Sequence, residues 1–198
     1  DIVQDPDVDV VDICTPNFLH KDIALAAIAN GKHVYSEKPL ALNAADAKLM
    51  YEAAKKAGVK TLVGFNYIKN PTTQLAREII ERGEIGEVVH FYGTHNEDYL
   101  ADANTPLDWH CIREKAGLGA LGDLSAHIVQ MSQYLLGQDI KEVIGDMETV
   151  IKTRPNPQNL AERLAVENED QATALVRFAN GCMGTIETSR IACGRKMG

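Results

Sequence analysis

Apolar runs and Ala-rich amphipathic stretches alternate along the first third of the chain, and this pattern predicts strands and helices. The predicted strands are Val8 to Cys14, Lys32 to Ser36 and Val59 to Phe65. The predicted helices run from Lys21 to Asn30, ending at Gly31, and from a cap at Asn43 to Lys56, ending at Gly58. Alternation at this spacing implies right-handed crossovers between parallel strands, and the near-continuous apolar first strand suits a sheet covered on both faces.

The pattern changes after a boundary predicted between Asn66 and Pro71. One helix to about Arg82 is followed by strand-like runs at Val88 to His95, Glu142 to Lys152, Ala172 to Phe178 and Cys182 to Ser189. The last two runs flank Ala179-Asn180-Gly181, and because Asn-Gly favours a tight hairpin turn, this half is predicted to be mainly antiparallel. The Pro- and Asn-rich stretch from Arg154 to Asn159 is predicted to be a surface loop. We therefore expect an α/β domain over residues 1–66 and an α+β domain over residues 67–198.

Composition limits the function classes. The chain has 198 residues, of which 45% are hydrophobic and 24% charged, as expected for a folded protein with one sizeable core or two modest ones. The net charge of -8 and the pI of about 5.2 argue against a nucleic-acid partner, since basic residues cluster only in pairs such as Lys55-Lys56. No apolar stretch is long enough to span a bilayer. We expect a small-molecule partner, with no nucleic-acid or membrane partner.

Cysteine usage bears on the cellular compartment. The four cysteines form no C-x-x-C pair, and Cys14 lies in an apolar run where a free thiol is expected to behave as a small hydrophobic residue. A reducing, cytoplasmic compartment fits this usage best. The chain begins at Asp1-Ile2-Val3, without an initiator Met or a signal-peptide pattern, so we expect it to be an internal segment of a longer protein.

One stretch, Gly117-Leu118-Gly119-Ala120-Leu121-Gly122, matches the G-x-G-x-x-G pattern of dinucleotide-binding loops. The residues before it, His110 to Lys115, are charged and do not form a buried strand. We therefore interpret the motif as a flexible loop that opens a helix at Asp123. The phosphate loop is then absent, and with three parallel strands in hand, about two βαβ units, roughly 60 residues, are expected upstream.

Polar residues follow two of the predicted parallel strands. Thr15, Pro16 and Asn17 end the first strand and His20 opens the next helix, where short polar groups can contact the ribose and phosphates of a cofactor. A simple helix cap explains the same residues. Asn66 ends the third strand, at the edge of the sheet where ligands of such folds bind, and it suits a polar contact with the nicotinamide side of a cofactor.

Asp123 and His127 are four residues apart on a predicted helix, so their side chains project from one face. An imidazole has a pKa of about 6.5 and can accept a proton from a substrate hydroxyl while hydride leaves the same carbon. The alternative is an N-cap at Asp123 and a half-buried His127. Lys38 would supply positive charge where alkoxide character develops, with Pro39 fixing the turn that presents it.

Four motifs occur along the chain in order: Thr15-Pro16-Asn17 with His20, Gly31-Lys32-His33-Val34 leading to Glu37-Lys38-Pro39, Val63-Gly64-Phe65-Asn66-Tyr67, and Gly119-Ala120-Leu121-x-Asp123-x-x-x-His127. Together they resemble the glucose-fructose oxidoreductase and inositol dehydrogenase family, also called Gfo/Idh/MocA, over essentially the whole chain. Ser125 departs from the pattern, in which Gly is common. The resemblance implies the second half of a Rossmann-type dinucleotide-binding domain and an incomplete substrate domain with a mainly antiparallel sheet.

The resemblance also implies roles for matching residues. Lys38 contacts the substrate hydroxyl and the nicotinamide ribose, Asp123 orients the substrate, and His127 is the general base. It places Glu37 near the cofactor, although the residues alone suit a surface carboxylate.

Other positions follow less directly from the resemblance. A Trp-Arg pair is common before the glycine loop and suggests Trp109 and Arg113 as cofactor contacts, although Trp109 equally suits a core. The implied cofactor is NAD or NADP. No H-E-x-x-H or Cys/His pairing suggests a metal, and the histidines left as structural are His33, His90, His95 and His110.

The function expected from these observations is hydride transfer between a nicotinamide cofactor and a hydroxyl of a sugar, polyol or related cyclic alcohol. Two alternatives stay open: a glycosidase that retains the nicotinamide and uses transient oxidation, and a non-catalytic sensor of the same fold. An antiparallel sheet with an apolar face needs covering, so a homo-oligomer, dimer or tetramer, is expected through that sheet.

Overall fold

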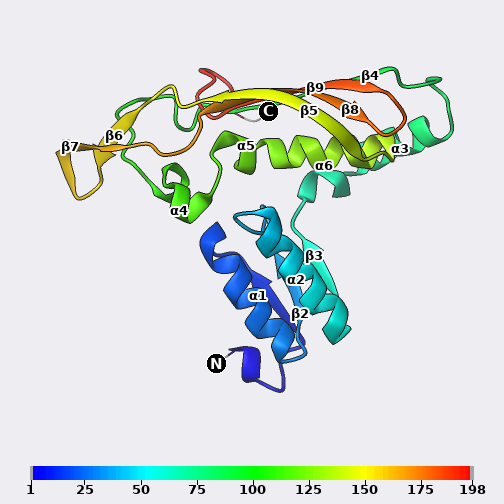
Figure 1. Cartoon of the computed structure of the whole chain (residues 1–198), viewed down its shortest axis with the longest axis horizontal. Coiled ribbons are helices and arrows are strands. Elements are labelled where there is room, and N and C mark those ends of the chain that lie inside the picture. The colour runs from blue at the N-terminus through cyan, green and yellow to red at the C-terminus, as the bar shows by residue number, and fades with distance from the viewer. Residues whose placement is uncertain (1, 197–198) are drawn as a thin grey trace. The chain divides into compact units, whose positions relative to one another are not determined.

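The computed structural model describes residues 2–196, and the chain forms two compact units (Figure 1). The first, here called the parallel unit, extends to Gly64 and includes Ile112–Gly117. The second, here called the mixed-sheet unit, contains Phe65–Cys111 and the chain from Leu118 onward. Each unit has its own hydrophobic core.

The parallel unit contains the strands and helices predicted for it. Strands β1 (Val10–Ile13), β2 (His33–Ser36) and β3 (Thr61–Val63) pair in parallel in the order β1-β2-β3. Helices α1 (His20–Ala29) and α2 (Ala44–Ala57) connect them, and short 3-10 turns lie at η1 (Ile2–Gln4) and η2 (Asn17–Leu19). The α/β fold class is confirmed.

Local sequence signals fix the ends of α2. The Asn43 side chain accepts a hydrogen bond from the Asp46 backbone N–H at 2.9 Å, as an N-cap does. Gly58 ends the helix with φ 69°, a left-handed conformation that glycine adopts without steric cost. These predicted boundaries therefore rest on interactions within a few residues of chain.

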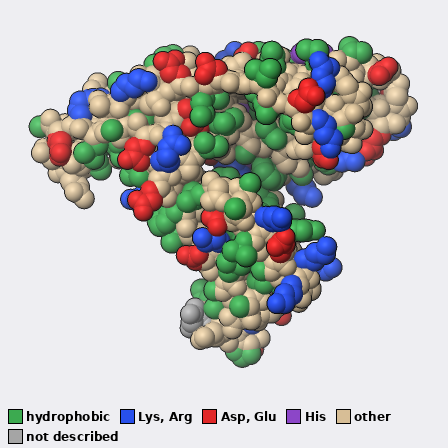
Figure 2. Space-filling model, in the orientation of Figure 1, with side chains coloured by type: hydrophobic (Ala, Val, Ile, Leu, Met, Phe, Trp, Pro, Cys, Tyr) green, Lys and Arg blue, Asp and Glu red, His purple; other side chains and the backbone are tan. Residues whose placement is uncertain are grey.

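The expectation of a sheet covered on both faces is wrong for the described chain. Successive right-handed crossovers from β1 to β2 to β3 run in one direction, so they place α1 and α2 on the same face of the sheet. Ile13 and Val34 are buried beneath these helices, whereas Val10 and Leu62 on the other face are 53% and 51% exposed. Figure 2 shows hydrophobic side chains reaching the surface among charged ones.

The mixed-sheet unit has a four-stranded sheet in the order β4-β9-β8-β5. Its strands are β4 (His90–Asn96), β5 (Ile140–Glu148), β8 (Gln171–Phe178) and β9 (Met183–Ser189). The predicted hairpin at Asn180-Gly181 joins β8 to β9, and β5 also pairs antiparallel with β8. Strand β4 lies parallel to β9, so the sheet is mixed although mainly antiparallel.

Helices cover one face of this sheet. The unit contains η3 (Asn66–Lys69), α3 (Pro71–Glu81), η4 (Trp109–Cys111), α5 (Ala120–Asp123) and α6 (Ser125–Leu136), while the short α4 (Arg113–Ala116) belongs to the parallel unit. Helix α6 packs closely on β4 and β9: a Cβ at Gly93 would lie 2.6 Å from the Ile128 Cγ2. Ile128, Val176, Phe178 and Ile186 form the core between helix and sheet.

The stretch from Arg154 to Asn159 is not the surface loop that was predicted. It forms part of a hairpin of β6 (Thr153–Asn156) and β7 (Asn159–Ala165). Arg154 is fully buried, and its guanidinium donates to the carbonyl oxygens of Asp102, at 2.9 Å, and Leu100. Pairing with a distant loop therefore overrides the loop signal that Pro and Asn give locally.

Two further sequence interpretations change. Among the described residues all four cysteines are free, but Cys14 is exposed rather than part of the core, because it lies just after the last residue of β1. The helix predicted from Asp123 is two helices, α5 and α6, with Leu124 between them. In the part of the chain that the structure describes, no helix combines the length and apolar character needed to cross a membrane.

A buried ion pair joins the end of β9 to the segment before β8. The Arg190 Nε donates to Asp170 Oδ1 at 2.9 Å, and the two side chains are 1% and 0% exposed. The remaining guanidinium nitrogens donate to Asn168 Oδ1 at 3.0 Å and to the His110 carbonyl at 3.1 Å. The charge is therefore buried with its hydrogen bonds made, as burial of an ion requires.

Gly119, within the G-x-G-x-x-G match, lies against this pair. A Cβ on Gly119 would be 2.0 Å from the Glu169 carbonyl oxygen and 3.0 Å from Arg190 Nη1. The Ala120 N–H donates to the same Glu169 carbonyl at 3.0 Å. The glycine is required for this close backbone approach, which supports the interpretation that the motif is not a phosphate loop.

We expect Gly119→Ala to lower the free energy of unfolding by about 3 kcal/mol or more, because the backbone at Glu169 would have to move. Gly64→Ala is the control, since its Cβ would meet only the carboxylate of Glu37, 3.2 Å from Oε1, at the end of a flexible side chain that can shift. Urea unfolding followed by circular dichroism measures both variants. A Gly119→Ala variant as stable as the wild type would contradict this account.

Candidate active-site residues

In the parallel unit, predicted cofactor-binding residues follow the carboxyl ends of β1 and β2. Thr15, Pro16 and Asn17 come after β1, and Glu37 and Lys38 come after β2. The Glu37 N–H donates to the Ile13 carbonyl at 2.9 Å, so the hydrogen-bonded ladder continues one residue beyond β2. The ends of neighbouring parallel strands are thereby held side by side, in the position where open α/β sheets bind ligands.

His20 ties these two strand ends together. Its ring is fully buried, with Nδ1 3.0 Å from the Pro39 carbonyl and Nε2 2.8 Å from the Thr15 carbonyl. A neutral imidazole donates from one nitrogen only, so it donates to one of these carbonyls at a time. The predicted cofactor contact of His20 stays a prediction, and the structure gives the ring a role in holding the turn around the cis Lys38–Pro39 peptide bond.

Asn17 and Thr15 are both drawn inward at the end of β1. Asn17 is buried, and its Nδ2 donates to the Ala116 carbonyl at 3.1 Å, which fixes α4 to the start of η2. The Thr15 Oγ1 is buried and has no hydrogen-bond partner among residues 2–196. A buried hydroxyl without a partner at a strand end suits a cofactor site, because the ribose or a phosphate of the cofactor would supply the missing hydrogen bond.

Glu37 is half-buried and folds back on the backbone, which differs from a simple surface carboxylate. Its Oε2 accepts from the Lys38 N–H at 3.2 Å, and a Cβ on Gly64 would lie 3.2 Å from its Oε1. The pKa of the nearby Cys14 thiol is raised, mainly by its hydrogen bond to Asp12 and also by the negative charge of Glu37. Lys38 is half-buried beside this carboxylate in sequence.

In the mixed-sheet unit, His127 lies on α6 within a group of rings. The residue is 7% exposed, and its ring centroid is 4.6 Å from Tyr67, 5.6 Å from His95 and 6.0 Å from Phe65. The Tyr67 and His95 centroids are 5.7 Å apart, so three rings contact one another. Apolar ring faces exclude water from an imidazole, which strengthens its electrostatic interactions.

His95, predicted to be structural, lies beside His127 and carries a carboxylate partner. Its Nε2 is 3.1 Å from Glu97 Oε1, and a carboxylate accepts only, so Nε2 is the donor. His95 sits on the helix-facing side of β4, because it alternates with Phe91 and Gly93. The alternation along β4 could have indicated from the sequence that His95 faces the helices. Its contact with His127, 32 positions away, could not be inferred from the sequence.

Asp123 is the last residue of α5, and α6 has Leu124 as its N-cap, so the interpretation of Asp123 as a cap is wrong. The carboxylate Oδ2 accepts a hydrogen bond from the Tyr99 hydroxyl at 3.2 Å. Sequence reasoning missed Tyr99, which lies in the loop after β4. Asp123 and His127 come from the adjoining helices α5 and α6.

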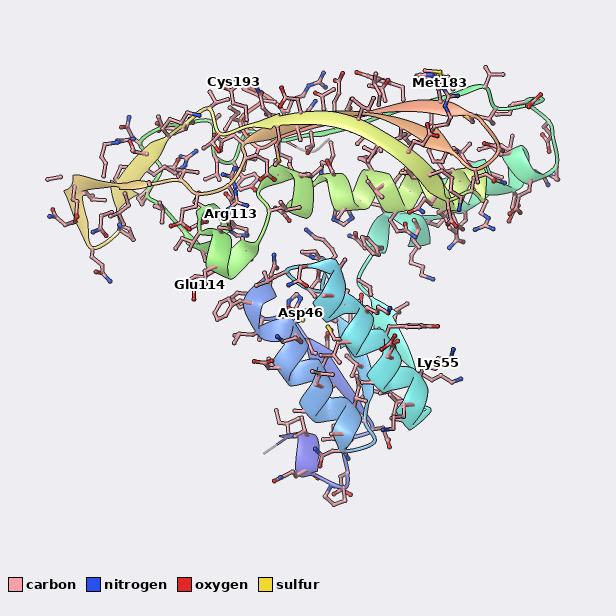
Figure 3. All side chains as sticks on the ribbon, in the orientation of Figure 1. Asp46, Lys55, Arg113, Glu114, Met183 and Cys193 are labelled. Atoms are coloured by element: carbon pink, nitrogen blue, oxygen red, sulfur yellow. The ribbon has the colours of Figure 1, made fainter. Side chains whose placement is uncertain are left out.

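The three remaining predicted cofactor-binding residues, Asn66, Trp109 and Arg113, lie on three different elements. Asn66 is exposed and opens η3, and Trp109 is half-buried and stacks on His110 at 3.8 Å. Arg113 is exposed on α4 (Figure 3) and belongs to the parallel unit, while Trp109 belongs to the other unit. The cofactor contacts of these three residues stay predictions. Within residues 2–196, no group of three or more His, Cys, Asp and Glu could hold a metal ion.

Comparison with known proteins gives two family matches that span most of the chain. Residues 1–65 match the model described as "Oxidoreductase family, NAD-binding Rossmann fold", and residues 73–197 match the "GFO/IDH/MocA C-terminal domain". Levoglucosan dehydrogenase of Pseudarthrobacter phenanthrenivorans is 41% identical over 205 residues, covering 98% of this chain and 52% of that protein.

Solved structures are similar over the same span. An NAD binding oxidoreductase from Klebsiella pneumoniae has a TM-score of 0.93 and 52% identity, covering 98% of this chain and 51% of that one. Levoglucosan dehydrogenase in complex with NADH and levoglucosan has a TM-score of 0.94 and 42% identity, covering 99% and 51%. The chain thus spans about half the length of the proteins it matches.

We expect His20→Phe to lower the free energy of unfolding by about 2 kcal/mol or more, because either the Thr15 or the Pro39 carbonyl loses its donor while the ring volume is kept. His90→Phe, at an exposed position on β4, is the control and should change stability little. Chemical unfolding measures the difference. Equal losses for the two variants would remove the role assigned to His20.

Proposed function

Because the chain belongs to the GFO/IDH/MocA oxidoreductase family, we propose that the protein containing it is an NAD-dependent dehydrogenase acting on a hydroxyl of a sugar, polyol or related cyclic alcohol. The observation that carries the proposal is the surroundings of His127. A buried imidazole with a second, carboxylate-linked imidazole against it is suited to taking a proton from a hydroxyl.

Bound NAD supplies the hydride acceptor. His127 accepts the hydroxyl proton as the hydride leaves the same carbon, and its ring becomes a cation. Burial between Tyr67 and Phe65 disfavours that cation, whereas the Glu97 carboxylate behind His95 favours it.

The other predicted site residues take the roles implied by the family. Lys38 contributes positive charge where alkoxide character develops, and Asp123 orients the substrate. The residues that would hold the cofactor are Thr15, Pro16, Asn17, His20, Glu37, Lys38, Asn66, Trp109 and Arg113. Support comes from the buried Thr15 hydroxyl and from the strand-end positions of Asn17 and Glu37.

Two observations favour this function over its alternatives. Named relatives such as levoglucosan dehydrogenase are dehydrogenases, and one similar structure holds NADH with a sugar, which also favours NAD over NADP. A glycosidase that retains its nicotinamide remains the second candidate, and a sensor of the same fold the third. We assign residues 1–66 to the C-terminal part of the dinucleotide-binding domain and residues 67–198 to the substrate domain.

We also propose that the protein assembles as a homo-oligomer through the outer face of the mixed sheet. The paired residues Tyr92, Thr185, Leu175 and Ile144 form a row across all four strands. Tyr92, Leu175 and Ile144 are 63%, 52% and 78% exposed, an apolar row that a second copy would cover.

A reducing, cytoplasmic setting is supported by the four free cysteines.

The activity is tested on the full-length protein with NAD or NADP and a panel of sugars and polyols, by following the absorbance of reduced nicotinamide. We expect reduction with NAD, and we expect His127→Ala and Lys38→Ala to lower kcat by about a hundredfold or more while circular dichroism stays unchanged. Lys55→Ala, an exposed lysine on α2 (Figure 3), is the control and should keep full activity.

The panel also separates the alternatives. Net reduction of NAD by a free sugar or polyol supports the dehydrogenase. Cleavage of a glycoside with no net reduction would move the assignment to the glycosidase, and no turnover of any substrate would move it to the sensor.

We expect Ile144→Asp to shift the protein to a smaller assembly, because a carboxylate at the β5 end of the apolar row would be desolvated on association. Leu160→Asp, at a 65% exposed position on β7, is the matched control and should leave the assembly unchanged. Sedimentation velocity measures both. An unchanged mass for Ile144→Asp would exclude the outer face as the interface.

A further inference from the structure

The loop after β4 brings Tyr99 to Asp123, and the geometry points to Tyr99 as a positioning residue that fixes the Asp123 carboxylate for the substrate. This inference rests on the proposed function for the role of Asp123. The Tyr99 hydroxyl donates to Asp123 Oδ2 at 3.2 Å, across 24 residues of chain.

The backbone on the Tyr99 side is fixed by buried arginines. The Leu100 N–H donates to the Arg190 carbonyl at 3.1 Å, and the Leu100 carbonyl accepts from the guanidinium of Arg154. Both arginines are fully buried, and Leu100 is 2% exposed. The loop therefore cannot shift Tyr99 without disturbing the interior of the unit.

The Tyr99 ring rests edge-on against His110, with centroids 6.4 Å apart and planes at 69°. His110 is itself held, because its Nδ1 lies 3.1 Å from Asp108 Oδ2 and Trp109 stacks on its ring at 3.8 Å. The direction in which the phenol points is therefore set by packing. Preorganised side chains of this kind place a hydrogen-bond donor without a loss of entropy on substrate binding.

The Asp123 side is held by the glycine turn. The Asp123 N–H donates to the Gly119 carbonyl at 3.0 Å, and Gly119 is pressed against the Glu169 backbone, where a Cβ would be 2.0 Å from the carbonyl oxygen. The Leu121 N–H donates to Glu169 Oε1 at 3.0 Å. Tyr99 and Asp123 are thus both attached to backbone that other hydrogen bonds hold in place.

A donor on one carboxylate oxygen sets the plane of the carboxylate. The substrate hydroxyl then donates to a carboxylate whose orientation is already fixed. This contact in turn orients the carbon that loses hydride. Hydrogen bonding to the ionised carboxylate also favours that form. The charged and titratable groups around the pair are Asp108 and Glu169 from loops, His110 in η4, Arg190 after β9, and His127 on α6.

The hydroxyl remains a donor over the working pH range. The pKa of Tyr99 is raised, first by partial removal from water of a side chain that stays 38% exposed, and then by the negative charge of Asp123, with Arg190 acting in the opposite direction. Loss of the hydroxyl removes a donor that stabilises the Asp123 anion, so the pKa of Asp123 should rise in Tyr99→Phe. Functions that need the anion would then be lost at a higher pH than in the wild type.

The test is Tyr99→Phe in the full-length protein, which deletes a single oxygen and keeps the ring against His110. We expect kcat/KM for the sugar or polyol to fall on the order of tenfold, mostly through KM, while KM for NAD is unchanged. The acid limb of the kcat/KM profile should stay in place, because the general base His127 sets it. A purely structural role would lower thermal stability and would not raise KM for the sugar or polyol selectively over KM for NAD.

Tyr92→Phe is the matched control, because its hydroxyl also donates to a carboxylate, Glu187 Oε2 at 3.1 Å, but on the outer face of the sheet. It should leave kcat/KM unchanged. If both variants behave alike, or if Tyr99→Phe leaves kcat/KM as in the wild type, the inference is overturned.

A measurement that does not depend on turnover separates this inference from the proposed function. The carboxyl-carbon NMR signal of Asp123, titrated in wild type and in Tyr99→Phe, should report a higher pKa in the variant. An unchanged titration would overturn the inference even in an active dehydrogenase. Conversely, a wild-type protein that reduces no nicotinamide while Asp123 titrates as expected would reject the proposed function and retain the contact.

Discussion

The buried ion pair between Arg190 and Asp170 is the constraint on which the mixed-sheet unit depends. Taking both charges out of water costs several kcal/mol per ion, and the cost is offset here by close geometry and by additional hydrogen bonds to Asn168 and to the His110 carbonyl. Removing either partner would leave an uncompensated charge in the interior. The pair therefore specifies one arrangement of the segments that meet at it.

Several of those segments carry the candidate site. The guanidinium lies against Gly119, whose turn leads into α5 and so into Asp123. It also donates to the carbonyl of His110, against whose ring Tyr99 rests. A single buried side chain thus sets the positions of the carboxylate and of the tyrosine that donates to it. The chemistry of the site is in this sense prepared by a residue that need not touch a substrate.

In the parallel unit, a neutral residue, His20, holds the site segments in place. Polar groups at the ends of β1 and β2 must be held in place while remaining available to a cofactor, and the buried ring of His20 links the two ends through backbone carbonyls. The rigid parts of both units are thus held by buried polar residues, whereas the groups proposed for chemistry lie at strand ends and on the helices α5 and α6. This division suits a site in which the reacting groups must be fixed before the substrate arrives.

The sequence by itself determined the features that depend on neighbouring residues. Asn43 and Gly58 bound α2 because a cap and a left-handed turn need only a few residues, and the Asn180-Gly181 turn joins β8 to β9 for the same reason. The ordered motifs around Lys38 and His127 were enough to identify the family.

Tertiary structure alone decided the rest. Arg154 lies in a buried strand despite its Pro- and Asn-rich surroundings, and His95 and Tyr99 reach His127 and Asp123 through pairing of β4 with β9 and packing on α6. Such contacts join residues tens of positions apart, and their energies come from burial and from hydrogen bonds made in the interior, which local pattern does not encode.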